Sequence, residues 1–176
     1  MTKQHAVSIV VMGTQGVGKS TVGRRLAEAL GVAFVDGDDL HPERNIALMA
    51  AGTPLTDADR EPWLHLVGGV LAERESSGGA VIACSALRRR YRDLIRAHVP
   101  HAYFVEPWGP IELVAERVGA RDHEYMPATL LQSQYDTLEP LAADEDGIRV
   151  SVVSTPEEIV DIVLADYSGI RAEGGA

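Results

Sequence analysis

The chain has 176 residues, of which 45% are hydrophobic and 24% charged, and its formal net charge is -10. This size and balance predict a single globular domain over residues 1–176. The acidic balance argues against a general nucleic-acid-binding surface, which is basic, but a local pocket could still take an anionic ligand. No apolar run approaches a membrane span, and the single cysteine, Cys84, suits a reducing compartment. We therefore expect a cytoplasmic protein that partners neither nucleic acid nor membrane.

Short β-branched runs alternate with longer helical patterns along the chain. Strands are expected over residues 6–12, 32–36, 80–84, 102–106 and 148–153, which are apolar throughout, as in sheets covered on both faces. Helices are expected over residues 19–30, 57–75, 87–98, 111–121, 127–138 and 155–167, with a frayed tail over 171–176. This alternation predicts an α/β fold with a parallel sheet, whose ligands bind at the carboxyl ends of the strands.

The stretch GTQGVGKS, residues 13–20, lies between the first expected strand and the first expected helix. It fits the phosphate-binding pattern G-x-x-x-x-G-K-[ST] in the strand–loop–helix context that this pattern requires. Gly13, Gly16 and Gly18 allow backbone angles that turn successive N–H groups inward, which makes an anion-binding nest at a helix N-terminus. A glycine-rich turn with a solvated lysine is the alternative interpretation.

The residues around this loop predict how a nucleoside triphosphate with Mg²⁺ would be held. Lys19 would place its charge near the β- and γ-phosphates, Ser20 would hold Mg²⁺, and Thr21 would lie near the α-phosphate. The predicted ATP-binding residues of the loop are Gly13, Thr14, Gln15, Gly16, Val17, Gly18, Lys19, Ser20 and Thr21.

Acidic residues follow the second expected strand in DGDDLHPERN, residues 36–45. Phosphoryl transfer to an alcohol uses a carboxylate beside the attacking hydroxyl and a further group near the metal. Asp36 and Asp38 are two residues apart, so in an extended segment both would face the phosphate loop. We assign Asp38 as the base or orienter of the hydroxyl and Asp36 as a ligand of metal-bound water. An ordinary acidic turn is the alternative.

Arginines and a serine follow the acidic stretch. Arg60 could hold a substrate carboxylate as a bidentate fork, or it could form a surface ion pair. Ser85 ends the third expected strand, and Arg88, one turn into the next helix, could point into the cleft. Cys84 is interpreted as a small buried residue rather than a nucleophile. A solvated basic face with Asp93 as a local partner is predicted for Arg89, Arg90, Arg92 and Arg96.

Two further arginines suggest a mobile cap. Arg117 and Arg121 are four residues apart and would stack on one helix face. One guanidinium could lie against an adenine ring, and the other could neutralise charge on the transferring phosphoryl group. Alternatively, both are solvated and pair with Glu112 and Asp122. The nearby His123 could cover the substrate or simply be exposed.

Together these motifs resemble the gluconokinases, a family of P-loop small-molecule kinases. The resemblance covers nearly the whole chain: the phosphate loop, residues 36–64, residues 84–96, the arginine pair with His123, and LLQSQYDTLEPL at residues 130–141. The block over residues 36–64 is specific to this family. Shikimate, adenylate and adenylylsulfate kinases share only the phosphate loop and looser features.

The resemblance implies a reaction, a fold and a set of site residues. The reaction would be MgATP-dependent phosphorylation of D-gluconate on its terminal hydroxyl, giving 6-phosphogluconate. The fold would be a three-layer P-loop NTPase, similar to nucleoside-monophosphate kinases, with a five-stranded parallel sheet, a helical lid at about residues 117–137 and a homodimeric assembly. The gluconate site would include Asp38, His41, Arg60, Ser85 and Arg88, with Gln134 near substrate or nucleotide. The lid arginines would be Arg117, at the nucleotide, and Arg121, which would act in catalysis with Lys19 and Asp38.

One stretch departs from the family pattern. YFVEPWGP, residues 103–110, stands where similar enzymes have an aliphatic strand end and a small acidic or glycine turn. It could reshape the base of the lid helix or the adenine edge. Two other functions stay open: a kinase for a different small polyol acid, and a nucleotide-dependent regulatory module that has no acceptor.

Overall fold

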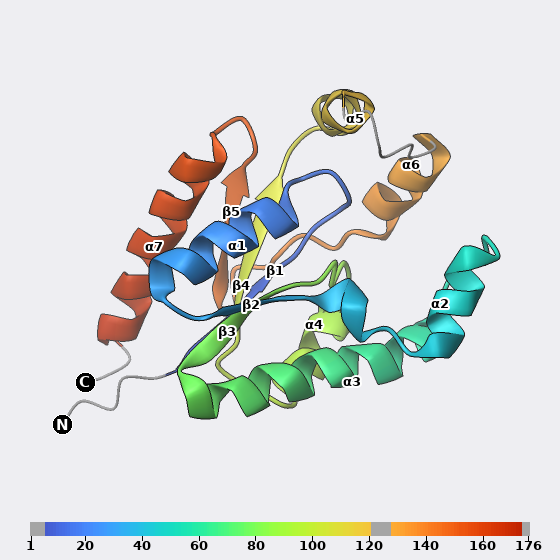
Figure 1. The fold of residues 1–176 in the computed structure, drawn as a ribbon. Coiled ribbons are helices and arrows are strands. Elements are labelled where there is room, and N and C mark those ends of the chain that lie inside the picture. Colours follow the sequence, from blue (N-terminus) through green and yellow to red (C-terminus); the bar gives the residue numbers. More distant parts are fainter. Residues whose placement is uncertain (1–5, 121–127, 174–176) are drawn as a thin grey trace.

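A sheet of five strands forms the centre of the computed structural model, which describes residues 6–120 and 128–173 (Figure 1). Every pairing is parallel, in the order β2-β3-β1-β4-β5. The five-stranded parallel sheet predicted from the sequence is thus confirmed. The strands are β1 Val7–Val11, β2 Ala33–Asp36, β3 Gly79–Ala83, β4 Tyr103–Trp108 and β5 Gly147–Ser151.

Helices cover both faces of the sheet. Buried residues of α1 and α7 pack with Ile9 and Val11 on one face, and buried residues of α3 and α4 pack with Val10 and Met12 on the other. Successive side chains of β1 thus enter opposite layers, as the two-residue period of a strand requires. The helices are α1 Lys19–Leu30, α2 Glu43–Ala50, α3 Asp57–Arg74, α4 Arg89–Arg96, α5 Ile111–Gly119, α6 Ala128–Thr137 and α7 Pro156–Glu173, and the 3₁₀ turns are η1 Gly37–Leu40 and η2 Glu75–Ser77.

The strand register brings three loops to one level. Val11, the last residue of β1, pairs with Ala83, the last residue of β3. Ala83 pairs in turn with Asp36, which ends β2. The loops that follow these strands therefore start side by side at the carboxyl edge of the sheet, where open parallel sheets bind their ligands.

Local sequence signals explain the ends of the principal helices. Gly31 follows α1 with φ 66°, a left-handed conformation that glycine adopts without strain. Thr56 and Asp59 form a reciprocal capping box at the start of α3, and Pro62 is accommodated near the start of that helix. These features match the expected helices over residues 19–30 and 57–75.

Other boundaries differ from the sequence prediction. The short helix α2 and the turn η1 were not predicted, and α4 covers residues 89–96 instead of 87–98. The last helix continues to Glu173, so residues 171–173 are helical rather than a frayed tail. No helix among the described residues has the length and apolar character that a membrane crossing requires.

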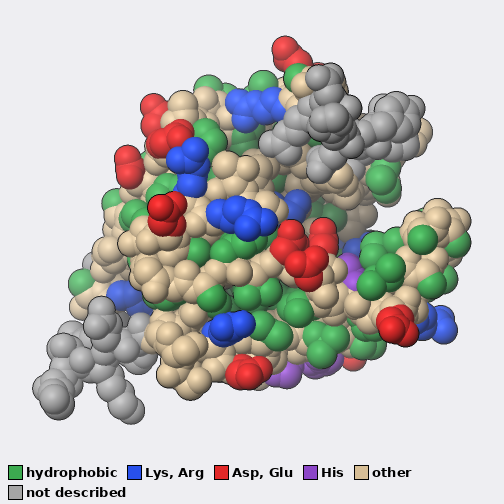
Figure 2. Space-filling model, viewed as in Figure 1, with side chains coloured by type: hydrophobic (Ala, Val, Ile, Leu, Met, Phe, Trp, Pro, Cys, Tyr) green, Lys and Arg blue, Asp and Glu red, His purple; other side chains and the backbone are tan. Residues whose placement is uncertain are grey.

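The face of the molecule in Figure 2 is hollowed between the arm that carries α2 and the part above it. Asp and Glu side chains gather beside this hollow, near Lys and Arg side chains. The loops after β1, β2 and β3 reach this side of the sheet (Figure 1).

Candidate active site

The phosphate loop begins directly after β1 and is fixed between its two neighbouring strands. The Met12 N–H donates to the Val105 carbonyl at 2.8 Å, and the Gly13 N–H donates to the Ser85 carbonyl at 3.1 Å. Gly13, Gly16 and Gly18 have φ values of 126°, 85° and 91°. Such angles strain residues that carry a Cβ, so the backbone itself requires the glycines of the motif.

The start of α1 has the properties of an anion cradle. Gly18 is its N-cap in the left-handed conformation, and no side chain among the described residues caps the helix. A Cβ placed on Gly18 would meet no described atom within 4 Å, so there is open space beside the first backbone N–H groups of α1. Uncapped N–H groups and the positive end of the helix dipole suit a phosphate group.

The polar side chains of the loop differ in their contacts and exposure. The Lys19 ammonium donates to the Thr14 carbonyl at 2.9 Å. Ser20 is half-buried and Thr21 is exposed, whereas Val17 and Thr14 are buried. Solvent thus reaches both of the residues with hydroxyl groups that follow Lys19. Their ligand roles stay predictions.

Helix α5 packs directly against the loop. A Cβ on Gly16 would lie 2.3 Å from a methyl carbon of Val118 and 3.1 Å from one of Val114. Arg117 is exposed on this helix, next to Val118. Arg121 and His123 lie outside the described residues, so the proposed cap pair of Arg117 and Arg121 stays a prediction.

The acidic segment turns sharply after β2. Asp36 ends the strand, and its carboxylate accepts a hydrogen bond of 3.1 Å from the Asp38 N–H. The chain then enters η1 at Gly37, which lies so close to β3 that a Cβ there would be 2.5 Å from the Ala83 carbonyl. The expectation of an extended segment with two parallel carboxylates is therefore wrong. Asp36 is half-buried and caps the turn, and Asp38 is exposed at the edge of the sheet.

The buried Cys84 thiol experiences the charges of three separate elements. Burial is the main cause that raises the pKa of Cys84 to about 12, and the Asp38 carboxylate adds to the rise. Lys19 and Arg60 act in the opposite direction on the same thiol. Lys19 at the start of α1, Asp38 of η1 and Arg60 of α3 thus all influence this one thiol. Cys84 is 1% exposed and stays protonated at neutral pH, which confirms a packing role rather than a nucleophilic one.

His41 is held next to this cluster by a ring stack and an amide. Its ring lies 4.0 Å from that of Trp63 at 16°, and Trp63 donates to the Gly37 carbonyl at 2.7 Å. The Asn45 amide nitrogen contacts His41 Nδ1 at 3.2 Å. Because an amide nitrogen only donates, Nδ1 is the acceptor and the proton of the neutral ring lies on Nε2. Burial lowers the pKa of His41, with a weaker opposing effect of Asp38, so the neutral ring is favoured.

Arg60 and Arg88 approach the same aromatic side chain. The Arg60 guanidinium lies 5.8 Å from the centre of the Tyr91 ring. The Tyr91 hydroxyl donates to Asp57, and this hydrogen bond is the main cause of a lowered Asp57 pKa, to which Arg88 also contributes. Arg88 is the N-cap of α4 and does not lie one turn inside the helix as expected. Its Nε is buried with no hydrogen-bond partner among the described residues, which a carboxylate ligand would correct.

Gln134 contacts the phosphate loop. Its side-chain oxygen accepts a hydrogen bond of 2.6 Å from the Gln15 N–H. The neighbouring Tyr135 donates to the Gly109 carbonyl at 2.8 Å. The sequence placed Gln134 near substrate or nucleotide; the structure shows it against the phosphate loop, and its ligand role stays a prediction. Tyr135 was not singled out from the sequence, because a tyrosine within a helical pattern gives no signal of its own.

The basic run after β3 is only partly a solvated face. Arg89 and Arg90 are exposed and pair with Asp144 and Asp57, and Arg96 pairs with Asp93 at 3.1 Å. Arg92 contradicts the prediction, because its side chain is fully buried and forms an ion pair with Glu145 at 2.7 Å. The partner lies 53 positions further along the chain, so no local pattern indicates this contact.

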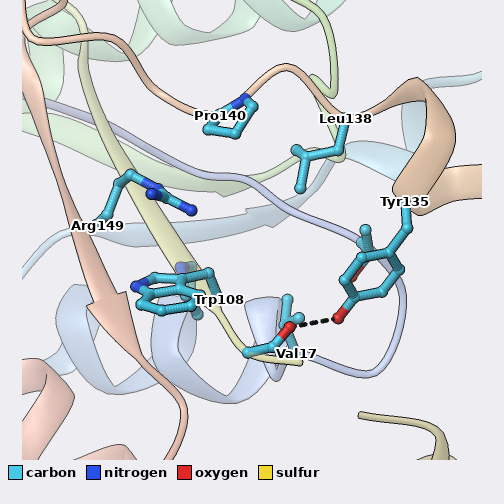
Figure 3. Close-up of a pocket in the computed structure, with 9 residues that line it drawn as sticks. Val17, Trp108, Tyr135, Leu138, Pro140 and Arg149 are labelled. Atoms are coloured by element: carbon cyan, nitrogen blue, oxygen red, sulfur yellow. Dashed lines mark hydrogen bonds between the residues drawn. The ribbon is translucent and has the colours of Figure 1, made fainter. Parts of the chain in front are cut away.

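The stretch that departs from the family pattern lines a pocket behind the phosphate loop (Figure 3). The pocket has a volume of about 240 Å³. Thr14 and Val17 border it from the loop, and Trp108 borders it from the end of β4, with the Arg149 guanidinium 4.9 Å from its ring. Pro110 is the N-cap of α5, so this stretch does form the base of the helix that leads toward the expected lid.

The sheet order, the phosphate loop and the adjoining carboxylate and arginine side chains define a kinase of the P-loop class. The family model described as Shikimate kinase matches residues 15–165. A gluconokinase from Gluconobacter oxydans is 43% identical over 160 residues, which are 90% of each chain. The chain belongs to the gluconokinase family, within the broader group of shikimate kinase-like domains.

Solved structures agree with this assignment. The crystal structure of a gluconokinase from Sinorhizobium meliloti superposes with a TM-score of 0.88 and 43% identity, covering 97% of both chains. A shikimate kinase from Aquifex aeolicus, at 21% identity and a TM-score of 0.64, shares the fold. The P-loop kinase fold predicted from the sequence is therefore confirmed.

Proposed function

We propose that this protein transfers the γ-phosphoryl group of ATP to the terminal hydroxyl of D-gluconate, giving 6-phospho-D-gluconate and ADP. One observation carries the proposal. The Arg60 guanidinium lies 5.8 Å from the Tyr91 ring, the buried Nε of Arg88 has no hydrogen-bond partner among the described residues, and Asp38 is exposed just after β2, whose end pairs with that of β3. Two guanidinium groups suit the carboxylate of a sugar acid, and a carboxylate beside the cradle suits a reacting hydroxyl. The names of the relatives support gluconate as that acid.

The nucleotide side fits ATP by its own chemistry. Uncapped N–H groups at the start of α1 would bind the phosphates, and the Lys19 ammonium would exchange the Thr14 carbonyl for a phosphate oxygen. Mg²⁺, when bound, would neutralise charge on the β- and γ-phosphates, held by the Ser20 hydroxyl and through water by Asp36. Hydroxyl and carboxylate oxygens are the ligands that Mg²⁺ prefers.

The acceptor side would bind and orient gluconate. Arg60 and Arg88 would hold the carboxylate, and the His41 Nε2–H would donate to a hydroxyl of the sugar chain. Asp38 would accept the proton of the terminal hydroxyl as that oxygen attacks the γ-phosphorus in line. Ser85, half-buried after β3, would contribute a further hydrogen bond.

A lid would close the site during transfer. We infer that the region of about residues 117–137 performs this role, with Arg117 near the adenine and Arg121 near the transferring phosphoryl group. Its support is the contact between α5 and Gly16, which joins the base of this region to the phosphate loop. Water exclusion matters because a kinase that closes without its acceptor hydrolyses ATP.

The test is an ADP-release assay with gluconate, shikimate, glycerate and adenylylsulfate as acceptors. We expect turnover with gluconate well above the others, and gluconate turnover equal to the buffer rate would refute the assignment. Asp38→Asn should keep ATP affinity and lose about 10²- to 10⁴-fold in kcat. Asp39→Asn is the matched control, because Asp39 is the adjacent exposed carboxylate and should keep its activity.

Arg60 distinguishes gluconate from an uncharged acceptor. Arg60→Met should raise the KM for gluconate far more than the KM for a neutral polyol, because only gluconate presents a carboxylate. An equal loss on both acceptors would contradict the carboxylate role. Homodimer formation and a cytoplasmic location stay predictions, and light scattering of the purified protein tests the first.

A further inference from the structure

Residues 134–139 connect the two loops that would hold the two substrates, and we call them the bridge segment. At one end, the Gln134 side-chain oxygen accepts from the Gln15 N–H of the phosphate loop at 2.6 Å. At the other end, the Glu139 N–H donates to the Leu87 carbonyl at 2.8 Å, and the Glu139 carboxylate accepts from the Arg89 N–H at 2.8 Å. One short segment thus bonds to both loops at their backbones.

The bridge segment is anchored along its length. The Leu138 N–H donates to the Gln134 carbonyl at 2.9 Å, the last helical bond of α6, and Leu138 packs against the main core. The buried Arg92 guanidinium donates from one nitrogen to the carbonyls of both Ala86 and Glu139, each at 3.1 Å. Since one planar group holds both, the loop after β3 and the bridge segment have little freedom to move independently.

The loop after β3 depends on such outside support. Ala86 has φ 40°, which a residue with a Cβ adopts only when its surroundings impose it. Ala86 lies between Ser85 and Arg88, the residues assigned to the acceptor. The bonds of Leu87 and Arg89 to Glu139 therefore stabilise the conformation that presents Ser85 and Arg88.

We propose that Gln134 and Glu139 are positioning residues that couple the acceptor site to the phosphate loop. This inference rests on the proposed function and identifies how that site is regulated by its own substrates. Acceptor binding at Arg88 further stabilises the conformation of the loop after β3. Glu139 transmits this stabilisation to the bridge segment, and Gln134 transmits it to the Gln15 N–H. Since such coupling is reciprocal, ATP strengthens acceptor binding by the same factor. Each coupling bond is a single hydrogen bond, which corresponds to roughly two- to twelvefold in affinity.

The first experiment measures this factor by calorimetry. The Kd of a nonhydrolysable ATP analogue is determined with and without gluconate, for the wild type, Gln134→Ala and Glu139→Ala. The coupling ratio is the Kd without gluconate divided by the Kd with gluconate. We expect this ratio to exceed one in the wild type and to be close to one in both variants. In turnover assays, each variant should also raise the KM of the remote substrate: gluconate for Gln134→Ala and ATP for Glu139→Ala. Glu139→Gln keeps an acceptor oxygen for the Arg89 N–H and should restore the ratio.

Matched controls come from the same elements. Gln132 is exposed on α6, and its one side-chain hydrogen bond among the described residues is to Asp136 of the same helix at 2.8 Å, so Gln132→Ala should keep the wild-type ratio. Asp144 pairs with the Arg89 side chain at 2.7 Å, whereas Glu139 holds the Arg89 backbone. Asp144→Asn should therefore keep the ratio as well.

A second experiment works without any acceptor. Hydrogen exchange of the ligand-free protein should show faster exchange at Gln15 in Glu139→Ala and at Arg89 in Gln134→Ala. The coupling would be overturned if each variant changed exchange only next to its own substitution. It would also be overturned if either variant kept the wild-type ratio of Kd values. If the wild type neither binds nor phosphorylates gluconate, the acceptor assignment fails, and the remote exchange effects alone decide the coupling.

Discussion

Arg92→Met tests the contribution of the buried Arg92–Glu145 ion pair to stability. The substitution removes two bonds to Glu145, at 2.7 and 2.8 Å, and the two bonds of 3.1 Å to the Ala86 and Glu139 carbonyls. Both side chains of the pair are at most 1% exposed, so the change leaves a carboxylate buried. Breaking a buried pair in this way costs about 3–5 kcal/mol. Since Arg96 still bonds to Glu145 at 2.9 Å, we expect about 3 kcal/mol.

The assay is urea unfolding followed by tryptophan fluorescence, because Trp63 is 1% exposed and reports on loss of the core. Arg25→Met is the control, since the exposed Arg25–Glu157 pair should contribute below about 1 kcal/mol. A loss for Arg92→Met that equals that of Arg25→Met would refute the reasoning and restore the solvated role predicted from the sequence.

The same pair predicts an acid-sensitive stability. Burial alone would raise the pKa of Glu145, but hydrogen bonds from Arg92, the Ala142 N–H and Arg96 outweigh it and hold the pKa at about 2. As pH falls, the Glu145 carboxylate therefore takes up its proton at a lower pH in the folded protein than in the unfolded chain. The resulting stabilisation, about 3 kcal/mol, is complete above pH 4.5 and is lost as pH falls toward 2. Urea unfolding of Glu145→Gln, which lacks the titrating group, should show a shallower acid limb in this window.

Three further outcomes follow from the site. Because burial lowers the pKa of His41 below its ordinary value of 6.5, kcat/KM for gluconate should stay flat through pH 6.5 and fall only at more acidic pH. His41→Gln should remove this limb, and a His41→Gln profile like that of the wild type would exclude the role. Gly16→Ala should lower the free energy of unfolding by about 1–3 kcal/mol and weaken ATP binding, because the added Cβ would lie 2.3 Å from a methyl carbon of Val118. Thermal melts measure the first effect and calorimetry the second, and an unchanged melting temperature would contradict the predicted clash. Cys84 should react with iodoacetamide at pH 8 only after unfolding, since burial raises its pKa to about 12; rapid labelling of the folded protein would show the thiol to be accessible.

The regular part of the fold could be predicted from the sequence because its signals are local. Apolar runs indicated the strands. Gly18 and Gly31 indicated the two ends of α1, where the structure has them. The phosphate loop was equally predictable, since its spacing is imposed by backbone angles rather than by distant contacts.

The missed features depend on contacts far apart in the chain. The turn at Gly37 follows from its close approach to Ala83 on a neighbouring strand, which spacing alone does not reveal. The burial of Arg92 depends on Glu145, and the contact of Tyr135 depends on the Gly109 carbonyl. Side chains with distant partners look like solvated ones in a sequence.

The helix α2 offers a route to a changed acceptor preference. Asn45 is its one buried residue, and Ile46 and Met49 are 52% and 44% exposed. The sheet and its two helix layers are complete without this arm, whose base carries His41. Selection or design could therefore vary the exposed residues of α2 at small thermodynamic cost and leave the phosphate loop intact, which, with the proposed function, would change the acceptor preference alone.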